Sequence, residues 1–440
     1  MSSIFEKYKR HLGLPFHRTF ISLLVILVTL FVDSGGNPEL SFVALLGVIL
    51  VLIGASRYEF LYIIMFLSIN YEIMYYKGVP LFVVIWLFYC LKFLPRTRII
   101  FSILWIVLVL AIYRLLVGVF IYNSGVFSAI APVFKLLLVV VVFVDILVKS
   151  NLPVTQIWNT SIYYLALGLV SSSIISFVIS PNRMGRFSVV ISKNMSNDLA
   201  IAAGFATGCI MLILQSRVGH KRFHWWILLV FTIGIGMMTL SRTYFMMFII
   251  SVFWVLLASF NFSRNRSHAV LLFLLLGALM GSPYFLQEQS LFRAMISRFN
   301  TSAGQNIVSG RDLIWEVYAD HFRSGLRTAI FGMFDSKLFG VEMMAHNAWI
   351  ELWALYGLVG MLLVAILGFI VVRFFSRFMK SQEYALSIYG FLPLFLYLAA
   401  AWYSHNIVGN IRTFSLLLAF ISLYLFQPRR IGHGWPIVSN

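Results

Sequence analysis

The sequence predicts an all-α integral membrane protein, a polytopic bundle of about 14 transmembrane helices with one long extramembrane loop. Of its 440 residues 61% are hydrophobic and only 11% are charged, and the mean hydropathy is +0.93. Soluble domains carry about a quarter charged residues, so lipid is the expected solvent for most of this chain. Apolar stretches of the roughly 20 residues that a spanning helix needs recur along the sequence, and one long polar segment interrupts them.

The apolar stretches divide the chain into expected spans with both termini on the same side. The N-terminal segment is basic and polar and leads directly into the first span, which predicts a retained anchor. No internal repeat is visible, so residues 1–440 are expected to form a single membrane domain. The expected spans are 18–33, 40–55, 58–72, 79–94, 99–120, 129–149, 156–180, 197–215, 223–240, 242–260, 268–285, 346–372, 384–404 and 410–426.

The net charge of +18 could suggest a nucleic-acid partner, but its distribution favours a membrane. Loops on the side of the two termini carry nearly all of the excess Lys and Arg, as the positive-inside rule requires of cytoplasmic loops. The long loop is therefore expected to face outward, and nucleic acid is not an expected partner. Cys90 and Cys209 lie inside expected spans without CxxC spacing, which predicts core residues rather than a disulfide or a metal site.

Three charged residues fall inside the fifth and sixth spans. A charge within a bilayer is costly and normally faces a cavity or a partner. Arg114 and Lys135 could extend to the outer headgroups, or they could line an outward-facing cavity for an anion. Asp145 lies nearer the inner end of its span and is expected to pair with Lys149, one helical turn later.

Further cations stand at the outward side. The loop 181–197 contains Arg186 without a nearby acid, and Arg242 begins the span 242–260. A solvated loop and an interfacial anchor are the simpler interpretations of these two residues. An outward basic loop nevertheless departs from the charge asymmetry of the other loops, so an anionic ligand is the alternative.

The long loop, residues 286–345, is expected to contain short amphipathic helices. Ser309 can cap a helix that begins near Arg311. A free helix N-terminus together with an arginine suits a phosphate group. The alternative is a salt bridge from Arg311 to Glu316 or Asp320. The apolar positions of this helix recur at helical spacing: Ile314, Val317, Tyr318 and Phe322.

A histidine stands where the loop meets the next span. His346 could be a catalytic base or a polar boundary residue, and Asn347 could cap the helix. Glu351 lies one turn further in, where an isolated carboxylate needs a partner or a cavity. His405 lies at the outward end of the span 384–404, so its expected depth in the membrane and its chemistry are similar to those of His346.

Other features of the sequence narrow the chemistry. Gly357 and Gly360 are expected to allow close helix packing. The outer loops contain no Walker loop, GxGxxG, HExxH or paired acids of the DxD kind, so no metal and no cofactor is expected. A transferase with a lipid-phosphate leaving group needs only cations for the diphosphate and one general base for the acceptor hydroxyl.

Two motifs together resemble the O-antigen polymerase and ligase superfamily, which contains Wzy-type polymerases and WaaL-type ligases. They are the GRxxxW-like element Gly310–Trp315 and the HNxxxExxxxxGxxG element His346–Gly360, within residues 236–362. The resemblance implies a helical membrane bundle with a large periplasmic loop. It also implies an undecaprenyl-diphosphate-linked glycan donor and metal-independent transfer with inversion.

The resemblance assigns roles to particular residues of this chain. Arg242 and Arg311 match the arginines that hold the diphosphate, and His346 matches the proposed base. Further candidates for substrate binding or support complete the predicted site: Arg186, Arg114, Lys135, Asn347, Glu351 and His405.

We therefore expect a polysaccharide polymerase in the bacterial inner membrane, with cytoplasmic termini and a periplasmic active site. Its partners would be a glycan donor and a glycan acceptor, both linked to undecaprenyl diphosphate, and the membrane lipids. A chain-length regulator protein is a further possible partner. An O-antigen ligase, which transfers the glycan to lipid A core, is the first alternative. A flippase for the same lipid-linked sugar is the second, although polar residues gathered on one outer face favour chemistry over passage.

Overall fold

The computed structural model describes the following residues: 22–24, 26, 38–67, 81–93, 98–123, 126–149, 154–179, 196–216, 222–239, 241–261, 311–323, 325–333, 347–380, 388–402 and 416–422. Within these ranges the chain is almost entirely helical and contains no strand. The helices are α3 (Pro38–Gly54), α4 (Arg57–Phe66), α5 (Leu81–Phe93), α6 (Arg98–Leu116), η3 (Val117–Ile121), α7 (Val126–Lys149), α8 (Val154–Ile179), α9 (Ser196–Ser216), α10 (Arg222–Met238), α11 (Arg242–Asn261), α14 (Arg311–Arg323), α15 (Leu326–Phe331), α16 (Ala348–Lys380), η6 (Ile388–Phe391) and α17 (Leu392–Trp402).

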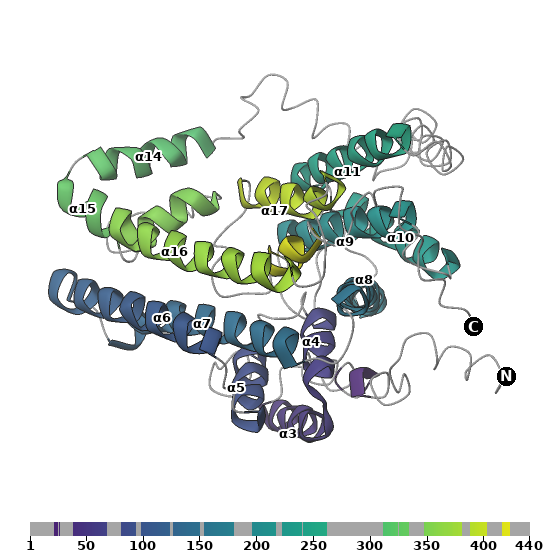
Figure 1. Ribbon diagram of the computed structural model, residues 1–440, viewed down its shortest axis with the longest axis horizontal. Coiled ribbons are helices and arrows are strands. Elements are labelled where there is room, and N and C mark those ends of the chain that lie inside the picture. Colours follow the sequence, from purple (N-terminus) through teal and green to yellow (C-terminus); the bar gives the residue numbers. More distant parts are fainter. Residues whose placement is uncertain are drawn as a thin grey trace.

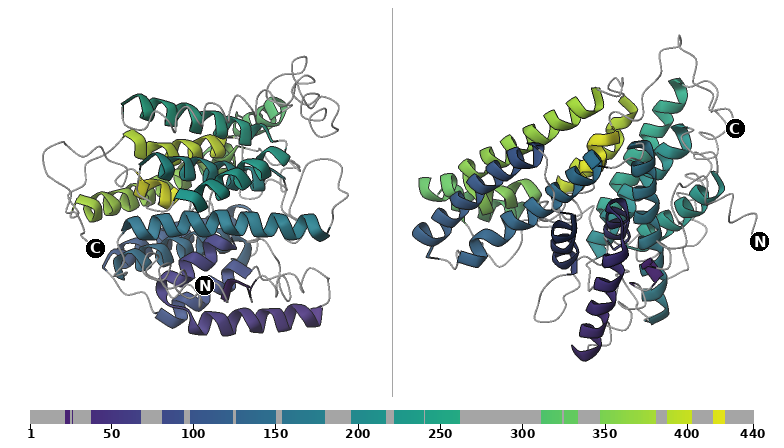
Figure 2. Two further views of the ribbon diagram at one scale, coloured as in Figure 1. Left: turned by 90° about the vertical axis from the view of Figure 1, so that its right-hand side faces the viewer. Right: turned by 60° about the horizontal axis from the view of Figure 1, so that its bottom comes forward.

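The helices pack around two centres (Figures 1 and 2). Helix α9 contacts α8, α10, α11 and α17. Helix α6 runs along α7 and also contacts α16, so that α16 lies between α6 and the loop helices α14 and α15 (Figure 1). Helices α4 and α5 join the two centres, because α4 packs on α8 and α5 packs on α7.

One large apolar core runs through the bundle, and apolar side chains also cover much of its outside. Trp86, Trp158 and Tyr244 are buried in the core. On α3, by contrast, Val43 and Leu50 are exposed. Helices that are apolar on the inner and the outer face are expected where the surrounding solvent is lipid.

Within the described residues, three helical segments are long and apolar enough to cross a membrane: Ile103–Ile121, Val154–Val178 and Ala348–Phe374. Shorter apolar helices accompany them in the described part of the chain. The predicted all-α class is confirmed there, and the apolar helices favour an integral membrane protein. The number of fourteen spans stays a prediction, since 268–285 and most of 18–33 lie outside the described residues.

One expected span differs from a regular helix. Residues 346–372 were expected to form one continuous span, but α16 is broken at Gly357, whose φ is 61° and ψ is −176°. A helix can break inside an apolar segment only if other groups satisfy the backbone that the break releases. At Gly357 these groups come from side chains of α6 and from the backbone that follows α15.

Candidate functional site

Helices α14 and α15 are held against the first turns of α16 by a small apolar cluster. The ring of Phe322 on α14 stacks on Trp353 of α16, with centroids 4.0 Å apart and planes 7° apart. The indole N–H of Trp353 donates a hydrogen bond of 3.0 Å to the carbonyl oxygen of Ala329. The cluster consists of Ile314, Trp315, Tyr318, Phe322, Met333, Ile350, Trp353 and Ala354.

The expected amphipathic helix in the loop is confirmed, with one difference on its apolar face. It begins at Arg311, as predicted, and Tyr318 and Phe322 are buried on the cluster. Val317 belongs to the same predicted apolar set but is 46% exposed, because the face that packs on α16 is narrower than the sequence pattern.

Two residues of the predicted site lie at the start of α16. Asn347 is buried, and its Oδ1 accepts hydrogen bonds from the N–H groups of Trp349 at 3.0 Å and Ile350 at 3.3 Å. The predicted cap is thus confirmed, since these are N–H groups without an intrahelical acceptor. Glu351, one turn later, is also buried.

The break in α16 brings two glycine backbones together. Gly332, which follows α15, has a φ of 80°, and a Cβ there would lie 2.6 Å from the amide nitrogen of Gly357. Beside them the N–H of Met333 donates a 2.6 Å hydrogen bond to the carbonyl oxygen of Ala354. Gly357 thus does more than the predicted close packing, because it ends one helical segment and starts another.

Two side chains of α6 satisfy further carbonyl groups at this break. Tyr113 Oη donates a hydrogen bond of 2.7 Å to the carbonyl oxygen of Tyr356. Arg114 Nη1 donates to the carbonyl oxygen of Leu355, and its guanidinium carbon lies 4.9 Å from the centre of the Tyr356 ring. Arg114 is 2% exposed, so its charge is placed against the carbonyl end of a helical segment.

A reciprocal contact fastens α15 to the end of α6 and η3. Arg327 donates a hydrogen bond to the carbonyl oxygen of Ile121, and its guanidinium lies over the Tyr122 ring, 5.2 Å from the centroid. Tyr122 Oη in turn donates to the carbonyl oxygen of Gly332. Burial raises the pKa of Tyr122, and the charge of Arg327 partly opposes that rise.

The structure thus brings three predicted site residues to two helices that contact each other: Arg114 on α6, and Asn347 and Glu351 at the start of α16. Helix α14, which begins with Arg311, packs on the same segment of α16. Arg242 begins α11, which packs mainly on α9 and α17. The remaining predicted site residues have positions or side chains outside the described part of the structure: Arg186, His346, His405 and the side chains of Lys135 and Arg311.

No protein-family model and no curated protein matches this chain. The roles of the predicted site residues in binding and catalysis accordingly stay predictions. Among the described residues, no group of three or more His, Cys, Asp or Glu side chains could hold a metal ion.

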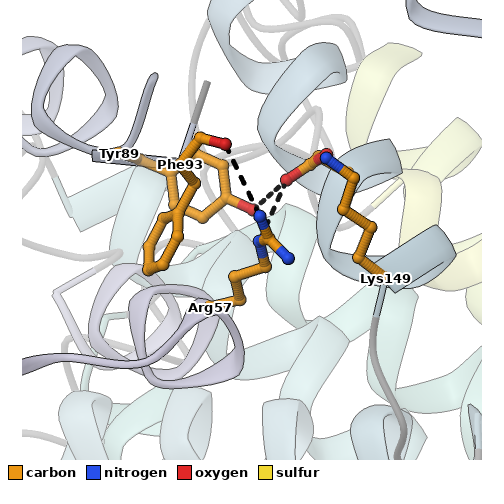
Figure 3. A network of polar contacts seen from close by, with 5 residues as sticks. Arg57, Tyr89, Phe93 and Lys149 are labelled. Carbon is orange, nitrogen blue, oxygen red and sulfur yellow. Dashed lines mark hydrogen bonds and ion pairs between the residues drawn. The ribbon is translucent and has the colours of Figure 1, made fainter. Parts of the chain in front are cut away.

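A second polar cluster joins α4, α5 and α7 (Figure 3). Asp145 is fully buried, and it pairs with Lys149 at 3.0 Å, as predicted, and with Arg57 at 3.4 Å. Tyr89 Oη donates a hydrogen bond of 2.7 Å to its carboxylate. The guanidinium of Arg57 also lies 4.9 Å from the centre of the Phe93 ring. This cluster connects three helices around one buried charge.

Cations at helix carbonyl ends are a recurring device that sequence reasoning missed. Lys92 of α5 donates to the carbonyl oxygens of Ile53 at 2.5 Å and Ala55 at 2.6 Å, at the end of α3. Arg327 and Arg114 do the same at the ends of η3 and of the first segment of α16. A lone cation inside an apolar span, such as Arg114, suggests an anion ligand from the sequence, but the carbonyl end of a helix also attracts positive charge. The sequence feature that could have indicated such a cap for Arg114 is Gly357, a glycine inside another apolar span where the helix can break.

Proposed function

We propose that this chain is a metal-independent membrane glycosyltransferase that polymerises a polysaccharide. It would transfer the glycan from one undecaprenyl diphosphate carrier to a second lipid-linked glycan, with inversion at the anomeric carbon. The active site would face the periplasm of a bacterium, with the protein in the inner membrane and both termini in the cytoplasm.

One observation carries the proposal. Two sequence elements that point to this chemistry, the helix that begins with Arg311 and the segment that follows His346, belong to α14 and α16. These helices share one apolar cluster, with Phe322 stacked on Trp353. The packing supports a shared site for a phosphate-binding arginine and a histidine base, because both elements join helices that pack on the same apolar cluster.

In the proposal the residues have two tasks: activation of the acceptor hydroxyl and stabilisation of the departing diphosphate. The acceptor hydroxyl oxygen attacks the anomeric carbon of the donor, and the bond from that carbon to the diphosphate oxygen breaks. Undecaprenyl diphosphate leaves with the electron pair, and His346 takes the proton of the hydroxyl. Arg311 and Arg242 compensate the charge that grows on the diphosphate, with Arg186 and Lys135 as further cations in the proposed site.

The other residues of the predicted site support this chemistry in the proposal. Asn347, the residue after the proposed base in the sequence, caps α16 and so fixes where that helix begins. Glu351 lies buried one turn later and is the nearest described carboxylate along the chain that could assist the histidine. His405 serves as the comparison histidine, since it matches no motif of the superfamily.

The lipopolysaccharide of a strain that lacks this chain tests the proposal. Core carrying a single repeat unit is the expected result for a lost polymerase. Core alone, with polymer left on the carrier lipid, would instead indicate a ligase. Core alone without any polymer would indicate a flippase and would overturn the enzymatic proposal.

The purified protein tests the base directly. His346→Ala should retain its abundance and donor binding but transfer the glycan about 10²–10⁴-fold more slowly, which is the contribution of a positioned general base. His405→Ala is the matched control and should be close to wild type. Wild-type turnover by His346→Ala together with a defect in His405→Ala would show that His405, and not His346, serves as the base.

A further inference from the structure

The break in α16 separates the segment after Asn347 from the rest of the helix. A regular helix transmits its orientation along its whole length through its own hydrogen bonds. At Gly357 this continuity ends, so Ala348–Tyr356 is a short helical segment whose last carbonyl groups lack intrahelical donors. In an apolar surrounding such groups must find donors elsewhere.

Helix α6 provides two of the donors, and one of them is charged. Tyr113 Oη donates to Tyr356, and Arg114 donates to Leu355. A hydrogen bond from an ionised donor is roughly twice as strong as a neutral one, and a cation at a helix C-terminus also interacts favourably with the helix dipole. These contacts account for the burial of Arg114 without an anionic ligand.

Helix η3, which continues α6, and Tyr122 directly after it also hold the segment that packs beside the break. Tyr122 donates to the carbonyl oxygen of Gly332, whose backbone touches Gly357. Arg327 binds the carbonyl oxygen of Ile121 in the opposite direction. The short segment of α16 is thus held directly by α6 and, through the residues after α15, by the end of η3.

We propose that Tyr113 and Arg114 of α6, together with Tyr122 directly after η3, are positioning residues, which set the orientation of the α16 segment that follows Asn347 and carries Glu351. The inference rests on the proposed function, because it is the glycosyl-transfer site that this segment would orient. In this inference Arg114 binds a backbone carbonyl group of α16, and it does not bind the diphosphate of the substrate.

Hydrogen–deuterium exchange tests the contacts independently of any activity. Each hydroxyl contributes one hydrogen bond, so Tyr113→Phe and Tyr122→Phe should speed amide exchange in peptides covering 348–356 by about two- to tenfold. Tyr397→Phe on α17 is the control, since its buried hydroxyl has no partner among the described residues. Unchanged exchange in both test variants would overturn the inference, and because Tyr→Phe barely alters volume, misfolding would not obscure the result.

Kinetics with lipid-linked repeat units then distinguish positioning from binding. Loss of a positioning contact in Tyr113→Phe and Arg114→Gln should lower kcat while KM for the donor stays within about twofold. Arg114→Lys should recover much of the activity, because a cap needs one charged donor and Lys92 already serves as such a cap on α3. A raised KM without recovery by lysine would show that Arg114 holds the diphosphate and would overturn its assignment to the backbone.

The two measurements also separate this inference from the proposed function. Wild-type protein without transfer activity would overturn the proposed function, while the exchange data would still decide whether α6 holds the segment. Faster exchange with unchanged kcat in active protein would contradict the positioning role.

Discussion

The backbones of Gly332 and Gly357 meet at the break in α16, where a Cβ on Gly332 would lie 2.6 Å from the amide nitrogen of Gly357. Both residues have positive φ with ψ close to 180°, a conformation essentially restricted to glycine. The contact joins the end of α15 to an interior position of α16, which the sequence pattern presents as one uninterrupted span.

Substitution of either glycine should therefore be severe. Gly332→Ala and Gly357→Ala are each expected to lower the free energy of unfolding by about 2–4 kcal/mol, from backbone strain and steric overlap together. The melting temperature in detergent provides the measurement. Gly368→Ala on the same helix is the matched control, because a Cβ there meets nothing within 4 Å. Equal stability of Gly357→Ala and Gly368→Ala would contradict the described break.

The stack of Phe322 on Trp353 predicts how firmly α14 is attached. Phe322→Ala removes a buried ring and should destabilise the attachment by about 3 kcal/mol, so limited proteolysis should cut near α14 sooner and transfer should fall. Val317→Ala on the same helix changes an exposed side chain and should leave both measurements unchanged. Equal protease sensitivity of the two variants would show that α14 is held by other contacts.

The cluster around Asp145 predicts a stability effect separate from activity. Asp145→Asn leaves the charges of Arg57 and Lys149 without their buried partner. Their side chains are 30% and 25% exposed and can be partly rehydrated, so the loss should be below the ~3–5 kcal/mol typical of a fully buried pair. Tyr89→Phe removes only one hydrogen bond and should cost about 1 kcal/mol. Thermal unfolding that ranks Tyr89→Phe as the more damaging change would contradict this account.

The proposed diphosphate site predicts that arginine cannot be replaced by lysine. Arg311→Lys and Arg242→Lys keep the charge but lose the planar pair of donors, so we expect a large loss of transfer at either position. The comparison with Arg114→Lys, for which recovery is expected, makes the test specific. Near-normal polymer from Arg311→Lys would mean that Arg311 only stabilises the start of α14.

Cysteine labelling tests the proposed topology without reference to chemistry. In a variant without Cys90 and Cys209, single cysteines replacing Phe187 and Gln305 should react with an impermeant reagent added from the periplasm. A cysteine replacing Gly219 should be protected. The reverse pattern would place the long loop in the cytoplasm and would exclude a periplasmic active site.

Local patterns were sufficient for the features that depend on neighbouring residues. The amphipathic helix that starts at Arg311, the Asn347 cap and the Asp145–Lys149 pair follow from periodicity, capping chemistry and one-turn spacing, and the structure confirms all three. Arg57 and Tyr89 could not be placed beside Asp145 in the same way, because they come from different helices and their spacing in the chain carries no signal.

By itself the sequence determined the helical, apolar character of this protein. Hydropathy and charge are properties of neighbouring residues in the chain, so they can be calculated without knowing which helices contact each other. The sequence also determined which loop holds the helix of Arg311. Only the tertiary structure decided that α16 breaks at Gly357 and that Arg114 caps its first segment. A glycine in an apolar stretch is compatible with a helix or a break, and the choice depends on donors that residues of α6 and α15 bring from distant parts of the chain.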